Sequence, residues 1–176
     1  MSPPAAKIFV SVGEKFACVK IVGRANFTSS IDFKTLMDEL LQTGYAWFVL
    51  DLTECALMDS TFLGVLAGLG LKINGPQADG SERTLEFFNP NARIVELLEN
   101  LGVLHLFKIT KGEIKYPEKT EPRELTPATA SREEVKLTCL EAHKTLMEIN
   151  PQNVSRFREL TQFLAEDLKK LKAGSV

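Results

Sequence analysis

The sequence predicts an α/β fold, in which helices pack against a mixed β-sheet, followed by a C-terminal α-helical hairpin. Two β-rich runs open the chain, and strand-like and helix-like segments then alternate up to about residue 110. After a proline-rich stretch, apolar residues recur every three or four positions. The alternating part favours parallel strands joined by right-handed crossovers. We therefore expect a first unit over residues 1–110, a linker or arm over 111–130 and a helical hairpin over 131–176.

The first unit should begin with a β-hairpin, because the β-rich residues 7–12 and 16–22 flank a short turn. Thr28, Ser29 and Ser30 are N-cap candidates for a helix that should end at Gly44. The apolar positions of this helix are Ile31, Leu36, Leu40 and Leu41.

Residues 46–52 form a nearly continuous apolar run, which is typical of a central strand covered on both faces. A loop over residues 53–58 should follow. Asp59-Ser60-Thr61 then supplies N-cap candidates for an apolar helix from 62 to about 73. Asn74-Gly75-Pro76 should end that helix.

The last part of the first unit should be a strand, a helix and a short strand. The strand is expected over residues 84–88, and Asn89 should cap a helix whose first turn contains Pro90. Gly102 should end the helix, and residues 105–109 should form the last strand.

The C-terminal third has a different composition. Three prolines interrupt residues 111–130, and Ser131 to Glu134 then has the S-x-x-E form of a capping box. Two amphipathic helices should follow, separated by Asn150-Pro151. They are too small to hold a core alone, so they should pack on the first unit or join two copies of the chain as a homodimer.

Composition excludes several classes of function. The 21 basic and 23 acidic residues give a formal charge of -2, which argues against nucleic-acid binding. Residues 62–71 are the most apolar stretch and are half the length of a membrane span, and the first residues do not form a signal peptide. We expect a cytoplasmic protein with reduced cysteines, no membrane insertion, no metal site and no cofactor.

Asp59-Ser60-Thr61 lies where a buried strand gives way to a helix. On spacing alone the favoured interpretation is an ordinary N-cap. The functional alternative is a phosphorylation switch, because a helix N-terminus tolerates a phosphate while a partner surface docked there does not. No pairing of a nucleophile with a histidine is evident in the sequence, so no catalytic residues are predicted.

Two segments resemble the signature of the STAS domain, and more narrowly of bacterial anti-sigma-factor antagonists. The first is Val49-Leu50-Asp51-Leu52, and the second runs from Leu57-Met58-Asp59-Ser60-Thr61 to Leu66. The expected order of strands and helices over residues 7–109 also matches that fold, and Asn89 to Ile94 resembles its later strand-to-helix turn. The resemblance thus covers about two thirds of the chain.

The resemblance implies that Ser60 is the phosphoacceptor, with Thr61 as a weaker candidate. It implies a non-enzymatic regulator that binds an anti-sigma factor or a serine kinase of the GHKL type, is released on phosphorylation and is restored by a serine phosphatase. The implied partner-binding residues are Asn26, Met58, Asp59, Thr61 and Phe62. The alternative is a STAS scaffold or ligand-binding subunit of a signalling or transport assembly that is not phosphorylated.

This sequence departs from the family pattern at two positions. Asn26 stands where the family usually has an acidic residue. Because asparagine carries no charge, this replacement would weaken a contact to a partner arginine. Phe62 replaces a glycine beside the switch, and it is either part of the core or an exposed anchor for a partner. Gly64 and Gly68 lie one turn apart on the same helix, and close packing of the helix on the sheet is the expected reason for them.

Overall fold

The computed structural model describes residues 5–77, 79–113 and 121–174. Within these residues, strands β1 to β7 form one mixed sheet in the order β6-β5-β3-β2-β1-β7, and β4 pairs with β2 off this path. The strands are β1 (Lys7–Val12), β2 (Phe16–Ala25), β3 (Trp47–Asp51), β4 (Cys55–Met58), β5 (Thr84–Phe88), β6 (Lys108–Thr110) and β7 (Arg123–Glu124). The helices are α1 (Phe27–Thr43), α2 (Ser60–Asn74), α3 (Ala92–Asn100), the short 3-10 helix η1 (Leu104–Leu106), α4 (Arg132–Ile149) and α5 (Gln152–Ala173).

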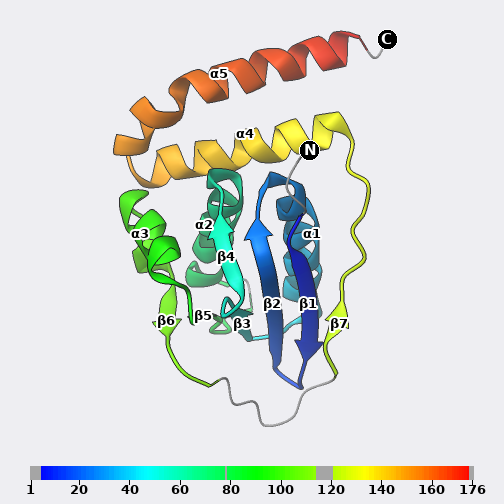
Figure 1. Ribbon diagram of the computed structural model, residues 1–176, viewed down its shortest axis with the longest axis vertical. Coiled ribbons are helices and arrows are strands. Elements are labelled where there is room, and N and C mark those ends of the chain that lie inside the picture. Colours follow the sequence, from blue (N-terminus) through cyan, green and yellow to red (C-terminus); the bar gives the residue numbers. More distant parts are fainter. Residues whose placement is uncertain (1–4, 78, 114–120, 175–176) are drawn as a thin grey trace.

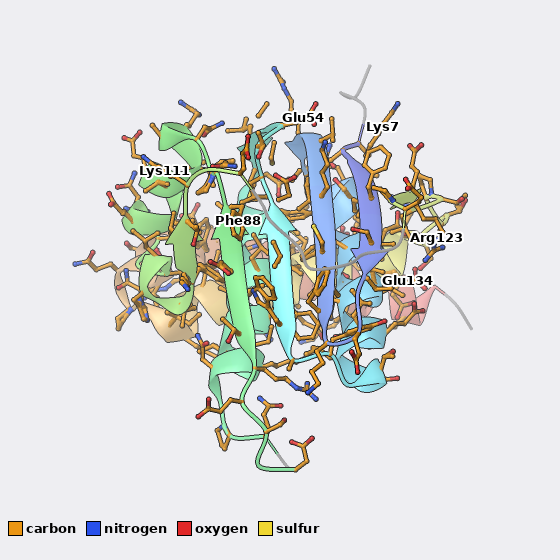
Figure 2. All side chains as sticks on the ribbon, turned by 90° about the horizontal axis from the view of Figure 1, so that it is seen from below. Lys7, Glu54, Phe88, Lys111, Arg123 and Glu134 are labelled. Carbon is orange, nitrogen blue, oxygen red and sulfur yellow. The ribbon has the colours of Figure 1, made fainter. Side chains whose placement is uncertain are left out.

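The sheet confirms the predicted fold class. β1 and β2 form the expected antiparallel hairpin, and β2, β3, β5 and β6 run parallel. Figure 2 shows these strands side by side, with Phe88 on β5 and Arg123 beyond β1 at the edge. Helices α1 and α2 cover one face of the sheet (Figure 1). The main core lies in this layer, where the buried rings of Phe33 and Phe62 are 4.9 Å apart.

The segment predicted as a loop over residues 53–58 contains strand β4. β2 extends three residues beyond the predicted end at Val22, and β4 pairs with this extension in parallel. β2 pairs with β3 up to Lys20 and with β4 from Gly23 on, and the register of the second pairing shifts between Gly23 and Arg24. The four residues of β4 have little apolar alternation, so the sequence pattern did not reveal this strand. The pairing brings the start of α2 next to the start of α1.

The predicted start of α3 is wrong by two residues. Asn91 is the N-cap, and its side chain accepts a hydrogen bond from the Ile94 amide at 2.9 Å. Asn89 has a left-handed backbone conformation, with φ 57°, and its side chain bonds both backbone groups of Gly112. Asn tolerates that conformation better than most residues, so Asn89 serves the turn rather than the helix. The predicted strand over residues 105–109 is also shorter, because η1 takes its first part.

The two C-terminal helices form the predicted hairpin. Ser131 and Glu134 make the expected capping box at the start of α4. Figure 1 shows α4 crossing the ends of α1 and α2, with α5 on its outer side. Buried Asn153 fastens the turn of the hairpin by donating hydrogen bonds to the carbonyls of Leu101 and Leu146. The hairpin therefore packs on the first unit. In the predicted arm, residues 114–120 with Pro117 lie outside the described residues, and Arg123–Glu124 pairs with β1.

Candidate functional site at the start of helix α2

Asp59 connects the N-termini of two helices. One carboxylate oxygen accepts a hydrogen bond from the Phe62 amide at 2.9 Å, which makes Asp59 the N-cap of α2. The other oxygen accepts from the amide of Phe27, the first residue of α1, at 2.7 Å. Both amides lack partners within their own helices, so one side chain satisfies two helix starts. Asp59 therefore holds the N-termini of α1 and α2 at one place.

Asn26 caps the neighbouring helix α1. Its side-chain oxygen accepts a hydrogen bond from the Ser29 backbone amide at 3.2 Å. In return, the Asn26 backbone amide donates a hydrogen bond to the Ser29 hydroxyl oxygen. The helix therefore starts at Phe27, ahead of the predicted N-cap candidates at residues 28–30. The Asn26 side chain is already used in this capping box, so its role within the fold is structural.

Ser60 is the first residue of α2 and is half-buried. Its hydroxyl lies 2.8 Å from Nε2 of His143 on α4. The other ring nitrogen, Nδ1, lies 2.7 Å from the carbonyl oxygen of Cys139. Because a carbonyl only accepts, Nδ1 of the neutral ring carries the hydrogen, and the Ser60 hydroxyl donates to Nε2. Sequence reasoning missed this pair because 83 residues separate its members.

Burial sets the protonation of this cluster. It lowers the pKa of His143, against the opposing effects of the Cys139 carbonyl and the Asp59 carboxylate. It also raises the pKa of Asp59, and hydrogen bonds from the Phe62 and Phe27 amides offset part of this rise. His143 is 1% exposed and its ring packs edge-on against Phe157. The neutral imidazole is thus the favoured form near pH 7.

A serine that donates to a neutral imidazole is also the arrangement that activates serine nucleophiles. Catalysis would need a substrate to reach Ser60 while His143 stays in place. Here α4 itself lies over the serine, and neither Ser60 nor His143 lines the cleft beside α4 described below. The pair is therefore better described as a contact between α2 and α4.

The contacts on both sides of Ser60 are close. The Thr61 hydroxyl lies 3.2 Å from the sulfur of Cys139 on α4, and Thr61 is 4% exposed. A Cβ atom built on Gly64 would overlap the Ala142 carbonyl and lie 2.7 Å from the Ala142 Cβ. Gly64 thus permits close approach of α4, whereas we expected it to pack on the sheet. Gly68 also faces α4, but a Cβ there would be 3.9 Å from the nearest atom, a Thr145 methyl carbon.

The other predicted partner-binding residues lie below the surface. Met58 is 2% exposed and Phe62 is 0% exposed, so both belong to the core. This decides between the two interpretations of Phe62: the ring fills the space between α1, α2 and the sheet. Neither side chain can touch a partner in this structure, because the packed core encloses them. Only Asn26, Asp59 and Ser60 of the predicted set keep partial exposure.

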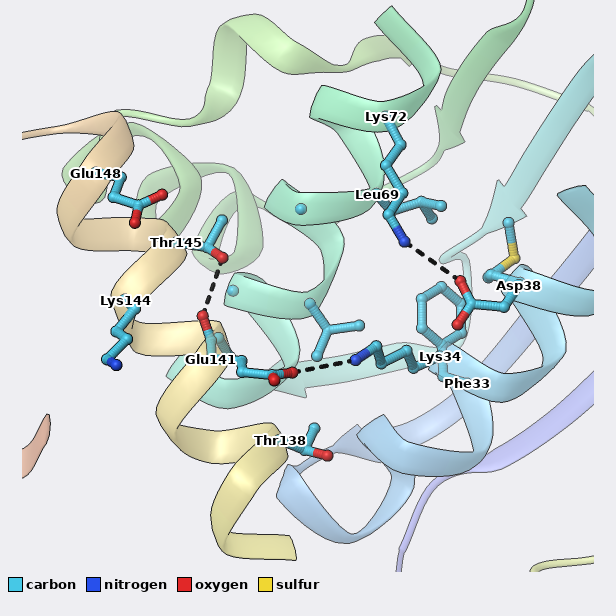
Figure 3. Close-up of a pocket in the computed structure, with 15 residues that line it drawn as sticks. Phe33, Lys34, Asp38, Leu69, Lys72, Thr138, Glu141, Lys144, Thr145 and Glu148 are labelled. Atoms are coloured by element: carbon cyan, nitrogen blue, oxygen red, sulfur yellow. Dashed lines mark hydrogen bonds and ion pairs between the residues drawn. The ribbon is translucent and has the colours of Figure 1, made fainter. Parts of the chain in front are cut away.

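A cleft of about 410 Å³ lies between α1, α2 and α4 (Figure 3). Apolar side chains such as Phe33, Val65 and Leu69 line it together with Gly68. Ion pairs cross its rim from Lys34 to Glu141 and from Lys72 to Asp38. The side of α4 that faces α1 is therefore incompletely filled.

Among the described residues, no three histidine, cysteine or acidic side chains gather as a metal site. In the same part of the chain, each helix is too short or too polar to cross a membrane.

No known family model matches the chain, and no curated protein matches it. Several solved structures are similar to it, and three of them are anti-sigma factor antagonist structures. The unphosphorylated anti-sigma factor antagonist SpoIIAA has 13% identity and a TM-score of 0.48, over 60% of this chain and 88% of that one. An anti-sigma factor antagonist from Mycobacterium paratuberculosis has 16% identity and a TM-score of 0.49, over 67% and 92%. Phosphorylated SpoIIAA from Bacillus has 13% identity and a TM-score of 0.45, over 60% and 91%. What this chain does must therefore be inferred from its own residues.

Proposed function

We propose that this chain is a regulatory protein that binds a partner protein and is switched by phosphorylation of Ser60. The observation that carries the proposal is the place of Ser60, the first residue of α2 and next to the N-cap Asp59. The positive end of the helix dipole stabilises a phosphate there, so the fold of the first unit tolerates the modification. The motif from Leu57 to Leu66 supports the same role through its resemblance to anti-sigma-factor antagonists.

The partner that fits this proposal is an anti-sigma factor or a serine kinase of the GHKL type. In the kinase step the γ-phosphoryl group of ATP moves to the Ser60 hydroxyl oxygen. The bond to ADP breaks, and the hydroxyl proton passes to a base of the kinase. A serine phosphatase hydrolyses the phosphate ester: water takes the phosphoryl group, the Ser60 hydroxyl is restored and inorganic phosphate is released. The dianionic phosphate changes the charge of a surface around Asn26, Asp59 and Ser60, and this weakens binding of the partner.

The test is phosphorylation by such a kinase with ATP, followed by mass spectrometry to locate the phosphate. We expect one phosphate on Ser60, none in Ser60→Ala, and an unchanged yield in Thr61→Val. Ser155→Ala is the matched control, because Ser155 is exposed on α5 and far from the site in sequence. Full phosphorylation of Ser60→Ala outside residues 59–62 would contradict the proposal.

One observation favours the alternative of a protein-binding scaffold that is not phosphorylated. Ser60 is half-buried and its hydroxyl is held by His143 on α4. If the chain is such a scaffold, the hairpin stays on α2 and no kinase modifies Ser60 in the folded chain. The kinase experiment separates the two functions, because the scaffold predicts phosphate incorporation only after denaturation.

A further inference from the structure

Helix α4 lies directly on the residue that the proposed function requires to be modified. His143 bonds the Ser60 hydroxyl, Cys139 contacts Thr61, and Ala142 packs on Gly64. These three α4 residues occupy one face of the helix over the first five residues of α2. Ser60 is half-buried and its hydroxyl is bonded to His143, so the hairpin restricts the access of a kinase to this hydroxyl.

We propose that the α4–α5 hairpin is a built-in cover of Ser60, and that phosphate on Ser60 releases residues 132–143 of α4 from α2. This proposal rests on the proposed function, because it concerns the same serine. A minor open state exposes Ser60 to the kinase, and the phosphate then makes that state the major one.

The closed contact depends on the hydroxyl hydrogen of Ser60. A phosphate at this position has lost that hydrogen and presents acceptor oxygens with a charge of about -1.5 to -2 at neutral pH. Nε2 of the neutral His143 is also an acceptor, so the two groups cannot form a hydrogen bond. The Asp59 carboxylate is beside the site and adds a second negative charge. The hydrogen bond that holds the cover is thus replaced by repulsion in a poorly hydrated place.

The packing of α4 on α2 next to Ser60 is tight, so the two helices cannot adjust easily to a phosphate between them. Gly64 and Ala142 approach so closely that a single extra carbon at Gly64 would overlap the α4 backbone. The Thr61 hydroxyl, on the residue after Ser60, is 3.2 Å from the Cys139 sulfur. Because these contacts involve backbone atoms and short side chains, rotation of a flexible side chain cannot make space.

Residues 132–143 of α4 can leave α2 together. Toward α1 it is held at an exposed ion pair, Lys34 with Glu141, beside the open cleft of Figure 3. Exposed ion pairs contribute little to stability. The hairpin also has contacts of its own, through the cluster of Leu140, Leu164 and Leu168 and through the ion pair of Lys136 with Asp167. It therefore keeps its two helices when it moves.

The other end of the hairpin should act as the pivot. Leu146 is fully buried in the main core, and Asn153 bonds the Leu101 carbonyl. The Asn150 side chain packs against Gly102, where a Cβ would collide with it. Release of α4 thus opens residues near Cys139 and His143, while the turn at residues 150–153 stays attached.

Cys139 provides the readout, and the buried Cys55 is the control in the same molecule. Phosphoserine is inserted at position 60 of the full chain during translation, which needs no kinase. Alkylation of each cysteine is then followed by mass spectrometry, and small-angle scattering gives the radius of gyration. Cys139 is half-buried in the closed state, and local opening exposes it further. We therefore expect Cys139 to react about tenfold faster than in the unmodified chain, with Cys55 unchanged. The radius of gyration should increase.

Two matched chains isolate the effect of the charge at position 60. Ser60→Ala removes the hydrogen bond without adding charge, and it should accelerate the alkylation of Cys139 much less than phosphoserine 60 does. Phosphoserine at exposed position 155 adds the same charge to α5 and should leave Cys139 unchanged. The cover does not open if phosphoserine 60 leaves both the alkylation rate of Cys139 and the radius of gyration unaltered. It also does not open if Cys139 is alkylated more slowly at a constant radius of gyration. In that case His143 has gained a proton and donates a hydrogen bond to the phosphate.

The two proposals can fail separately. Faster Cys139 alkylation in a chain that no kinase modifies at Ser60 removes the proposed function and supports the cover. Kinase modification of Ser60 without a change at Cys139 or in the radius of gyration removes the cover and supports the proposed function.

Discussion

Single residues at the start of α2 have structural and chemical roles at once. Asp59 caps α2 and also bonds the first amide of α1, while His143 accepts the hydroxyl hydrogen of Ser60 from a third helix. The chain keeps a half-buried carboxylate, Asp59, and a buried imidazole, His143, beside a serine, although burial disfavours the charged form of each. Their opposite pKa shifts give this small site a measurable pH dependence.

Folding lowers the pKa of His143 from the ordinary histidine value of about 6.5. Below that pH, His143 therefore takes up a proton more readily in the unfolded chain than in the folded chain. The contribution of His143 to the free energy of unfolding should therefore fall as the pH drops through about 6.5. Asp59 acts in the opposite direction at lower pH, because folding raises its pKa above 3.8. Urea unfolding between about pH 7.5 and 5.5 measures the first effect.

His143→Gln is the control for this pH dependence, because it removes the titrating ring and keeps a polar side chain. The variant should show a flatter dependence of its free energy of unfolding on pH over this range. His105 is present in both chains and cancels in the comparison. Parallel curves for the two proteins would show that folding does not shift the pKa of His143.

At the scale of helices, the contact between α2 and α4 depends on the position of a glycine in α2. Gly64 and Gly68 are both interior helix residues that face α4, yet only Gly64 needs to lack a Cβ. Glycine costs a helix about 1 kcal/mol relative to alanine. The close approach of Ala142 offsets that cost at Gly64, whereas at Gly68 the space opens toward the cleft.

The two glycines therefore form a matched pair for mutation. Gly64→Ala should lower the free energy of unfolding by about 1–3 kcal/mol, because the new methyl group overlaps the α4 backbone. Gly68→Ala should be neutral or stabilising by up to about 1 kcal/mol, because it improves helix propensity without a clash. Urea unfolding of both variants checks this. Equal effects at the two positions would mean that α4 does not approach α2 as closely as described.

Across the whole molecule, the hairpin is part of one structure with the sheet. Leu146 of α4 joins the main core, and residues 123–124 of the preceding segment pair with β1. The outer helix α5 depends mainly on α4, through a small separate cluster around Leu164. We therefore expect a single cooperative unfolding transition, with the outer part of the hairpin contributing less to it.

Two leucine substitutions test this arrangement. Leu146→Ala should lower the free energy of unfolding by about 3–5 kcal/mol, because it leaves a cavity in the main core. Leu164→Ala should cost about 2 kcal/mol, because the site is nearer the surface and can collapse. Thermal unfolding is followed by fluorescence of Trp47, the single tryptophan, and by circular dichroism of the helices. Loss of helix signal well before the Trp47 signal would show that the hairpin unfolds independently.

Local signals in the sequence determined most of the elements. Apolar periodicity and turn residues predicted β1, β3, β5 and both hairpin helices, and the capping box at Ser131 marked the start of α4. These features depend on residues close together in the chain, so they can be read directly. β4 was missed because its strand character comes from pairing with β2, and Asn91 was missed because Asn89 and Asn91 look equally able to cap.

The sequence by itself determined the α/β fold class, the C-terminal hairpin and the position of Ser60 at a strand-to-helix junction. Only the tertiary structure decided that Phe62 fills the core and that the hairpin packs on its own chain. It also brought His143 to Ser60 and Ala142 to Gly64. Contacts between residues about 80 positions apart depend on how helices pack, and no local pattern of side chains encodes that packing.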